Sequence, residues 1–128
     1  MGVSRAGAAA TPPAQPPVAL VCTVSGLPKP RGELTAEAIC ERISLRIHEA
    51  LELPVIRATQ VPAGDRARWV RLEIRLLPRG RAEAALTSRL HGKATDHPLL
   101  AVQVMDKPME LGDIDRLARL AGKTLADA

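Results

Sequence analysis

Aromatic side chains are nearly absent from this sequence, which has one Trp, Trp69, and neither Phe nor Tyr among its 128 residues. Apolar residues still make up 46% of the chain, and most of them are Ala, Leu, Val and Ile. A chain of this length forms one domain with a modest core, so we expect a core of aliphatic side chains. Proteins that stack nucleic-acid bases on a sheet need exposed aromatic rings, which this sequence can supply only at Trp69.

The sequence also lacks the motifs of common enzyme classes. It contains no GxSxG nucleophile elbow, no HExxH zinc motif, no phosphate-binding P-loop and no glycine fingerprint for a dinucleotide. Asp113 and Asp115, near the start of the last predicted helix, are interpreted as capping carboxylates rather than as an acid–base pair. We therefore expect a protein that is not an enzyme, with no catalytic residue and no cofactor.

Metal-binding patterns are weak. His91, Asp96 and His97 lie in one predicted loop and are acceptable zinc ligands, but their spacing matches no established metal motif. We interpret them as loop residues and His48 as a residue on the flank of a helix. The sequence predicts no metal site.

The two cysteines, Cys22 and Cys40, have neither CxxC nor zinc spacing. Cys22 is in phase with the apolar positions of a predicted strand, and Cys40 lies on the apolar stripe of a predicted helix, so both point into the layer between them. Cysteine is often fully buried as a free thiol, and we predict free thiols here. A disulfide is the alternative, and it requires an oxidising compartment.

No apolar run approaches the roughly 20 residues that a transmembrane helix needs, so we predict no membrane-spanning segment. Residues 1–17 are rich in Ala and Pro and lack the apolar core of a signal peptide. We interpret them as a disordered arm before one domain over residues 18–128. The compartment stays open: the missing signal peptide favours the cytoplasm, whereas a leader absent from this sequence would favour the periplasm.

Apolar patterns predict the element order β-α-β-β-β-β-α. The predicted elements are a strand over 18–24, a helix over 35–53, a strand over 55–61, a hairpin over 68–90, a strand over 99–105 and a helix beginning near Asp113. Thr35 is expected to cap the first helix, and Pro54 to end it. Consecutive strands flanked by two helices indicate an α+β two-layer sandwich, with a mixed sheet and both helices on one face.

Side-chain alternation predicts the register of the hairpin. A three-residue loop, with Gly80 in the left-handed conformation, pairs Leu77 with Arg81 and sets apolar residues opposite one another. The resulting pairs are Leu76 with Ala82, Ile74 with Ala84, and Leu72 with Leu86; the exception is Ser88 opposite Val70. On the other face, the same register predicts an ion pair between Arg75 and Glu83 and a cation–π contact between Trp69 and Arg89.

The hairpin is also the main candidate for binding anions, because it holds seven arginines and two acidic residues between Arg66 and Arg89. The candidate anion- or partner-binding residues are Arg66, Arg68, Trp69, Arg71, Arg79 and Arg81. A nucleic-acid surface would use such arginines for phosphate contacts. Exposed charges usually contribute little, so a solvated sheet face is the simpler interpretation.

The sheet face away from the helices is a second candidate surface. It would carry Val21 and Thr23 from the first strand and Gln103 and Met105 from the last. An apolar patch rimmed by arginine is suited to docking a partner protein or a second copy of the chain. An ordinary half-exposed sheet has the same pattern.

From Val18 to Ala128, the order of elements resembles small α/β domains of bacterial envelope proteins, namely the amino-terminal domain of TolB and the CsgG-type modules. The strand–helix–strand opening over Val18–Val61 carries the resemblance, together with a strand pair followed by the helix over Asp113–Ala121. The resemblance implies an envelope-side domain that binds other proteins. We therefore expect a non-enzymatic interaction or assembly module, with polyanion or nucleic-acid binding through hairpin 66–89 as the alternative.

Overall fold

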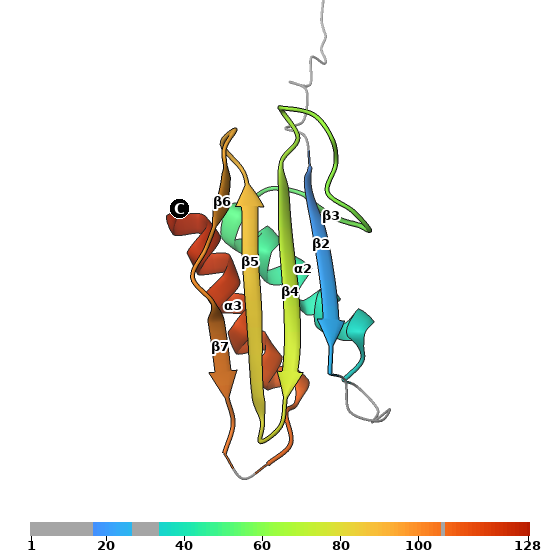
Figure 1. The fold of residues 1–128 in the computed structure, drawn as a ribbon, viewed down its shortest axis with the longest axis vertical. Coiled ribbons are helices and arrows are strands. Elements are labelled where there is room, and N and C mark those ends of the chain that lie inside the picture. Colours follow the sequence, from blue (N-terminus) through green and yellow to red (C-terminus); the bar gives the residue numbers. More distant parts are fainter. Residues whose placement is uncertain (1–16, 27–33, 106) are drawn as a thin grey trace, which may run out of the picture.

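The computed structural model describes residues 17–26, 34–105 and 107–128. These residues form a six-stranded mixed sheet with two helices against one of its faces (Figure 1). The predicted α+β sandwich and its order β-α-β-β-β-β-α are confirmed, with one short additional strand inside the segment that was interpreted as the His91–His97 loop. The predicted arm lies outside the described residues, except for Pro17.

The sheet consists of β2 (Val18–Ser25), β3 (Val55–Ala58), β4 (Trp69–Leu77), β5 (Arg81–Arg89), β6 (Ala94–Asp96) and β7 (Leu100–Gln103). Its order is β3-β2-β4-β5, and the far edge of β5 pairs with β6 at one end and β7 at the other. β2 is parallel to both β3 and β4. β3 is shorter than predicted. Ala19 pairs with Ile56 of β3 and also with Trp69, the first residue of β4, so β3 and β4 begin at nearly the same level along β2. The chain must therefore leave β3 early in order to return to that level before β4 begins.

The helices are α2 (Ala36–Leu51) and α3 (Leu111–Asp127), and they run in the same direction behind the sheet (Figure 1). Thr35 caps α2 as predicted, because its hydroxyl oxygen accepts a hydrogen bond from the backbone N–H of Ala38 at 3.1 Å. α3 begins earlier than predicted, with Glu110 as its N-cap. Asp113 accepts a hydrogen bond from the backbone N–H of Glu110 at 2.9 Å, so its predicted capping role is confirmed.

The core between sheet and helices is aliphatic, as predicted. Its largest fully buried side chains come from every main element and include Leu20, Ile43, Ile47, Leu72, Ile74, Leu86, Ile114 and Leu117. Burying one such side chain contributes about 1.5–3 kcal/mol, whereas an exposed ion pair contributes about 0–1 kcal/mol. The apolar layer therefore dominates the stability of the fold.

The register of the hairpin is as predicted in every pair, from Leu77 with Arg81 to Val70 with Ser88. Gly80 has φ 70°, the left-handed conformation expected of it, and Arg79 also has positive φ, 66°, which was not predicted. The turn lies against the segment after β7, because the backbone N–H of Val104 donates a hydrogen bond to the carbonyl of Gly80 at 2.8 Å. This contact crowds Gly80 and explains why the position carries no side chain.

Cys22 and Cys40 form a disulfide, with their Cα atoms 5.9 Å apart. The prediction of free thiols was therefore wrong, although both side chains point into the layer between β2 and α2 as expected. Strand alternation and helix periodicity placed each cysteine on the correct face. They did not show how far along the layer each one lies, and that separation decides whether the bond can form.

Removing the disulfide should weaken the fold considerably. The bond closes a loop with a sequence separation of 18, for which unfolded-state entropy predicts a loss of about 2–4 kcal/mol in the free energy of unfolding when Cys22 and Cys40 are both replaced by Ala. Urea denaturation measures this loss. Thiol titration of freshly purified, denatured protein should find no reactive thiol until a reductant is added; two reactive thiols beforehand would contradict the bond.

Gly80→Ala should cost about 2–4 kcal/mol of unfolding free energy, because left-handed backbone is unfavourable for Ala and overpacking adds to it. A Cβ at this position would lie 2.6 Å from Val104 Cγ2 and 2.7 Å from Val104 O. Gly92→Ala is the matched control, since Gly92 has φ 84° but no atom within 4 Å of its Cβ position. That control should lose only about 1 kcal/mol. Equal losses in urea denaturation would contradict the close packing of Gly80.

Candidate functional site

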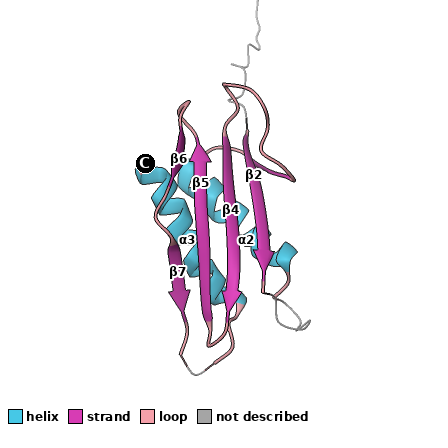
Figure 2. Ribbon diagram, viewed as in Figure 1, coloured by secondary structure: helices cyan, strands magenta, loops and turns pink. Residues whose placement is uncertain are grey.

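The sheet face that the helices leave uncovered is the first candidate surface (Figure 2). Its side chains alternate along each strand with those of the core. We use the term open face for the exposed strand residues on this side, which are Thr23, Ser25, Ile56, Arg71, Glu73, Arg75, Ala85, Ala94, Asp96 and Gln103. The open face is thus built from small, polar and charged side chains, with Ile56 at its β3 edge.

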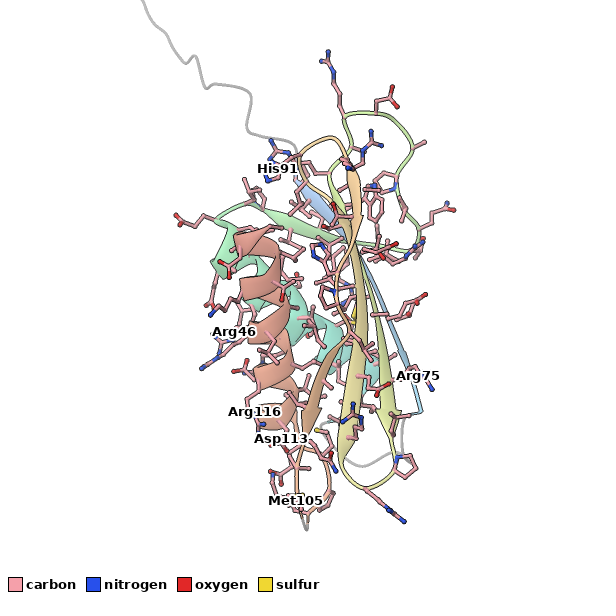
Figure 3. All side chains as sticks on the ribbon, turned by 60° about the vertical axis from the view of Figure 1, so that its left-hand side comes forward. Arg46, Arg75, His91, Met105, Asp113 and Arg116 are labelled. Atoms are coloured by element: carbon pink, nitrogen blue, oxygen red, sulfur yellow. A yellow bond between two sulfur atoms is a disulfide. The ribbon has the colours of Figure 1, made fainter. Side chains whose placement is uncertain are left out.

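Charges of both signs are interleaved along β4 and β5. Arg71, Glu73 and Arg75 follow one another on the same face of β4. On β5, Arg81 Nε donates to Glu83 Oε2 at 2.9 Å. Arg75 lies opposite Glu83 as predicted, but among the described contacts Glu83 is paired with Arg81, and Arg75 points away from the sheet (Figure 3). Register decided which residues are opposite, whereas side-chain reach decided which of them pair.

One end of this sheet face is covered by the link of residues 59–68. Arg89 holds the link, because its two terminal nitrogens donate to the carbonyls of Gly64 and Asp65 at 3.3 and 2.8 Å. Trp69 is consequently only 8% exposed. The predicted cation–π partner of Trp69 was Arg89, but the observed partner is Arg71, whose guanidinium carbon lies 6.0 Å from the ring centroid. Arg89 prefers carbonyl acceptors that the register could not reveal.

The six residues predicted to bind anions do not form one patch. Arg66, Arg68, Trp69 and Arg71 lie at or near the start of β4, whereas Arg79 and Arg81 lie at the hairpin tip. β4 has nine residues, and at about 3.3 Å per residue its ends are roughly 26 Å apart. Arg68 and Arg81 also have interactions of their own. The hairpin therefore presents no continuous basic groove.

The four residues predicted for docking are also placed differently from one another. Thr23 and Gln103 are exposed on the open face. Met105 is 74% exposed but follows the end of β7, and Val21 is only 6% exposed. Val21 therefore adds no accessible apolar surface, and the open face is more polar than the sequence indicated.

Two of the three histidines, His48 and His97, have structural partners. His97 Nε2 lies 2.7 Å from the Ser88 hydroxyl, which satisfies the one polar side chain that the hairpin directs toward the core. His48 Nδ1 lies 2.6 Å from the carbonyl oxygen of Leu53, and His91 is exposed at one end of the molecule (Figure 3). Within the described ranges, no group of His, Cys, Asp or Glu is arranged to hold a metal ion.

A shallow hollow of about 520 Å³ lies between α2 and the β3 edge of the sheet. Its lining residues are Glu37, Glu41, Ser44, Leu45, His48, Pro54, Val55 and Arg57. Arg57 Nη1 contacts Glu37 Oε1 at 3.3 Å. His48, which also lines the hollow, is held by the carbonyl of Leu53 through Nδ1.

A charged cluster on the helix layer was not predicted. Asp115, interpreted from sequence as a capping residue, instead contacts three arginines. Arg46 binds both of its oxygens, Nε to Oδ1 at 2.7 Å and Nη2 to Oδ2 at 3.1 Å. Arg42 Nη1 lies 3.3 Å from Oδ1, and Arg119 Nε lies 3.0 Å from Oδ2. Only the i,i+4 spacing of Asp115 and Arg119 was visible in sequence; the contacts with α2 join residues 69 and 73 positions apart.

The arginines keep Asp115 ionised. The hydrogen bond from Arg46 lowers the pKa of the Asp115 carboxyl below its ordinary value, against the opposing effect of burial, and the positive charges nearby lower it further. At Asp113, burial raises the pKa, but hydrogen bonds from Lys107 and from the Glu110 backbone make the net shift downward. Both carboxylates therefore stabilise the folded state in their charged form.

Asp115→Asn should lower the free energy of unfolding by about 1–3 kcal/mol at neutral pH, because the arginines lose a charged acceptor. The folded pKa of Asp115 is below the unfolded one, so its contribution is complete above about pH 4 and is lost as the pH falls through the folded value. Urea denaturation measures the free energy of unfolding of wild type and variant at about pH 7 and about pH 2. The difference between the two proteins should be smaller at the lower pH. A difference that stays constant would contradict the ionised cluster.

In the described part of the chain, no helix is long and apolar enough to span a bilayer.

Comparisons with known proteins assign no family. No protein-family model and no curated protein matches the sequence. One solved structure, described as an uncharacterized protein, is 10% identical over 88% of this chain and 92% of that one, with a TM-score of 0.41. A likeness at that level carries no argument about function.

Proposed function

We propose that this chain is a non-enzymatic protein-interaction or assembly module of an oxidising compartment, such as the bacterial cell envelope. It docks its partner, a second protein, through the open face. The observation that carries the proposal concerns the described residues: their helices lie against one face of the sheet, and the other face presents exposed charges of both signs. Such interleaving favours a partner with complementary charges, because matched charges give specificity and mismatched ones oppose binding.

The arrangement of the arginines favours this proposal over polyanion binding. Glu73 lies between Arg71 and Arg75 on β4, and Glu83 lies beside Arg81 on β5. A polyanion would meet these carboxylates wherever it met the arginines. Sites for nucleic acid backbones instead gather positive charge into one patch or stripe.

The disulfide supports the compartment. Disulfides persist in secreted, periplasmic and surface proteins and are rare in the reducing cytosol. The bond between Cys22 and Cys40 therefore favours the periplasmic reading over the cytoplasmic one. The resemblance of the element order to small domains of envelope proteins agrees with this choice.

The test exchanges two opposite charges on the open face. Glu73→Arg combined with Arg75→Glu keeps the net charge but reverses the local pattern, so recovery of the partner should fall about ten-fold or more. Tagged protein is cross-linked in its native cells and recovered from separate cytosolic and envelope fractions. Glu41→Arg combined with Lys123→Glu makes the same exchange on the helix layer and should leave recovery unchanged.

Two results would count against the proposal. One is the recovery of no specific partner from the envelope fraction with wild-type protein, and the other is an equal loss of partner in both exchange variants. A column of immobilised heparin, run at low and then rising salt, tests the alternative. Polyanion binding would be favoured instead if the column retained the protein tightly and the retention fell steeply as salt rose. The exchange of Glu73 and Arg75 should then change the retention.

A further inference from the structure

The cluster around Asp115 contains more arginine than the buried carboxylate needs. Asp115 is 8% exposed, and Arg46 satisfies both of its oxygens in the two-pronged geometry that suits a guanidinium and a carboxylate. Arg46 also donates through Nη1 to Glu49 Oε1 at 2.8 Å. One arginine thus accounts for Asp115 and for its neighbour Glu49.

Two further arginines are held at the same carboxylate from different helices. Arg42 of α2 contacts Oδ1 through Nη1, and Arg119 of α3 contacts Oδ2 through Nε. A guanidinium carries five N–H donors, so each of these arginines retains donors beyond its contact with Asp115. Their side chains are 35% and 64% exposed, so solvent and dissolved ligands can reach those donors.

The cluster also has a surplus of positive charge. Three guanidinium groups face two carboxylates, Asp115 and Glu49. The guanidinium groups repel one another, and a bound anion would reduce that repulsion. Because Arg42 and Arg119 are already held by Asp115, less side-chain entropy is lost when they engage a ligand.

We propose that Arg42 and Arg119, held in place by Asp115, form a binding site for a phosphate-type oxyanion at the seam between α2 and α3. Arginine suits this ligand because its planar donors match the geometry of phosphate oxygens. The site does not depend on the proposed docking function. Arg46 of the cluster and Arg75 of the open face lie on opposite sides of the molecule (Figure 3), so either proposal can fail alone.

Isothermal titration in about 0.1 M salt, where exposed charges more than about 10 Å apart are largely screened, tests the site with pyrophosphate as the probe. Wild-type protein should bind it saturably, and Arg42→Gln combined with Arg119→Gln should weaken the affinity about ten-fold or more. Arg71→Gln combined with Arg75→Gln is the matched control, because it removes the same charge from exposed arginines elsewhere. That control should change the affinity by less than about two-fold.

A second arm distinguishes two sources of the same phosphate chemistry. Sedimentation with vesicles of phosphatidylglycerol tests a lipid headgroup, whereas pyrophosphate tests a free ligand. The site is supported if the Arg42/Arg119 variant loses binding to either probe and the Arg71/Arg75 control keeps it. If that variant does not fold, Arg119→Gln by itself, at the more exposed position, should still weaken binding about three-fold. The proposal would be overturned if wild-type protein bound neither probe. It would also be overturned if the Arg42/Arg119 variant and the Arg71/Arg75 control lost binding equally.

Discussion

The pairing of β4 with β5 is the constraint on which the rest of the structure depends, because it decides which side chains face the helices. In the observed register Ile74 meets Ala84 and Leu72 meets Leu86, so one face of both strands is apolar and the other carries charge. A shift of one residue would exchange the two faces. It would bring the charges into the layer where α2 and α3 pack, at a cost that the aliphatic core could not offset.

Most of the fold could be predicted because its causes are local in sequence. The alternation along residues 68–90 and the Pro78-Arg79-Gly80 turn set the register, and Thr35 and Pro54 mark the ends of α2. The contacts that could not be predicted depend on how elements pack. Cys22 and Cys40 meet only because α2 lies over β2 at one particular height, and Asp115 meets Arg46 only because the two helices lie side by side.

The candidate site was predicted less well than the fold, for a related reason. Register identifies opposite residues, but long side chains choose among several acceptors within reach. Glu83 is paired with Arg81 rather than with Arg75, and Arg89 donates to backbone carbonyls in the link instead of contacting Trp69. An arginine count along the hairpin therefore overstated how much positive charge the open face can present at one place.

Helix α2 is held on two sides by interactions of different kinds. Cys40 bonds it to β2, while Arg46 binds Asp115 on α3. The helices approach closely at Gly122, where a Cβ would lie 2.9 Å from the Cβ of Ala50 and 3.1 Å from Arg46 O. A disulfide of this loop length contributes about 3 kcal/mol, and a hydrogen bond to a charged group contributes about 1.5–3 kcal/mol, so both restraints hold α2 in place. Because Arg46 alone binds both oxygens of Asp115, we expect the fold to tolerate the loss of Arg42 and Arg119, whose remaining donors form the proposed anion site.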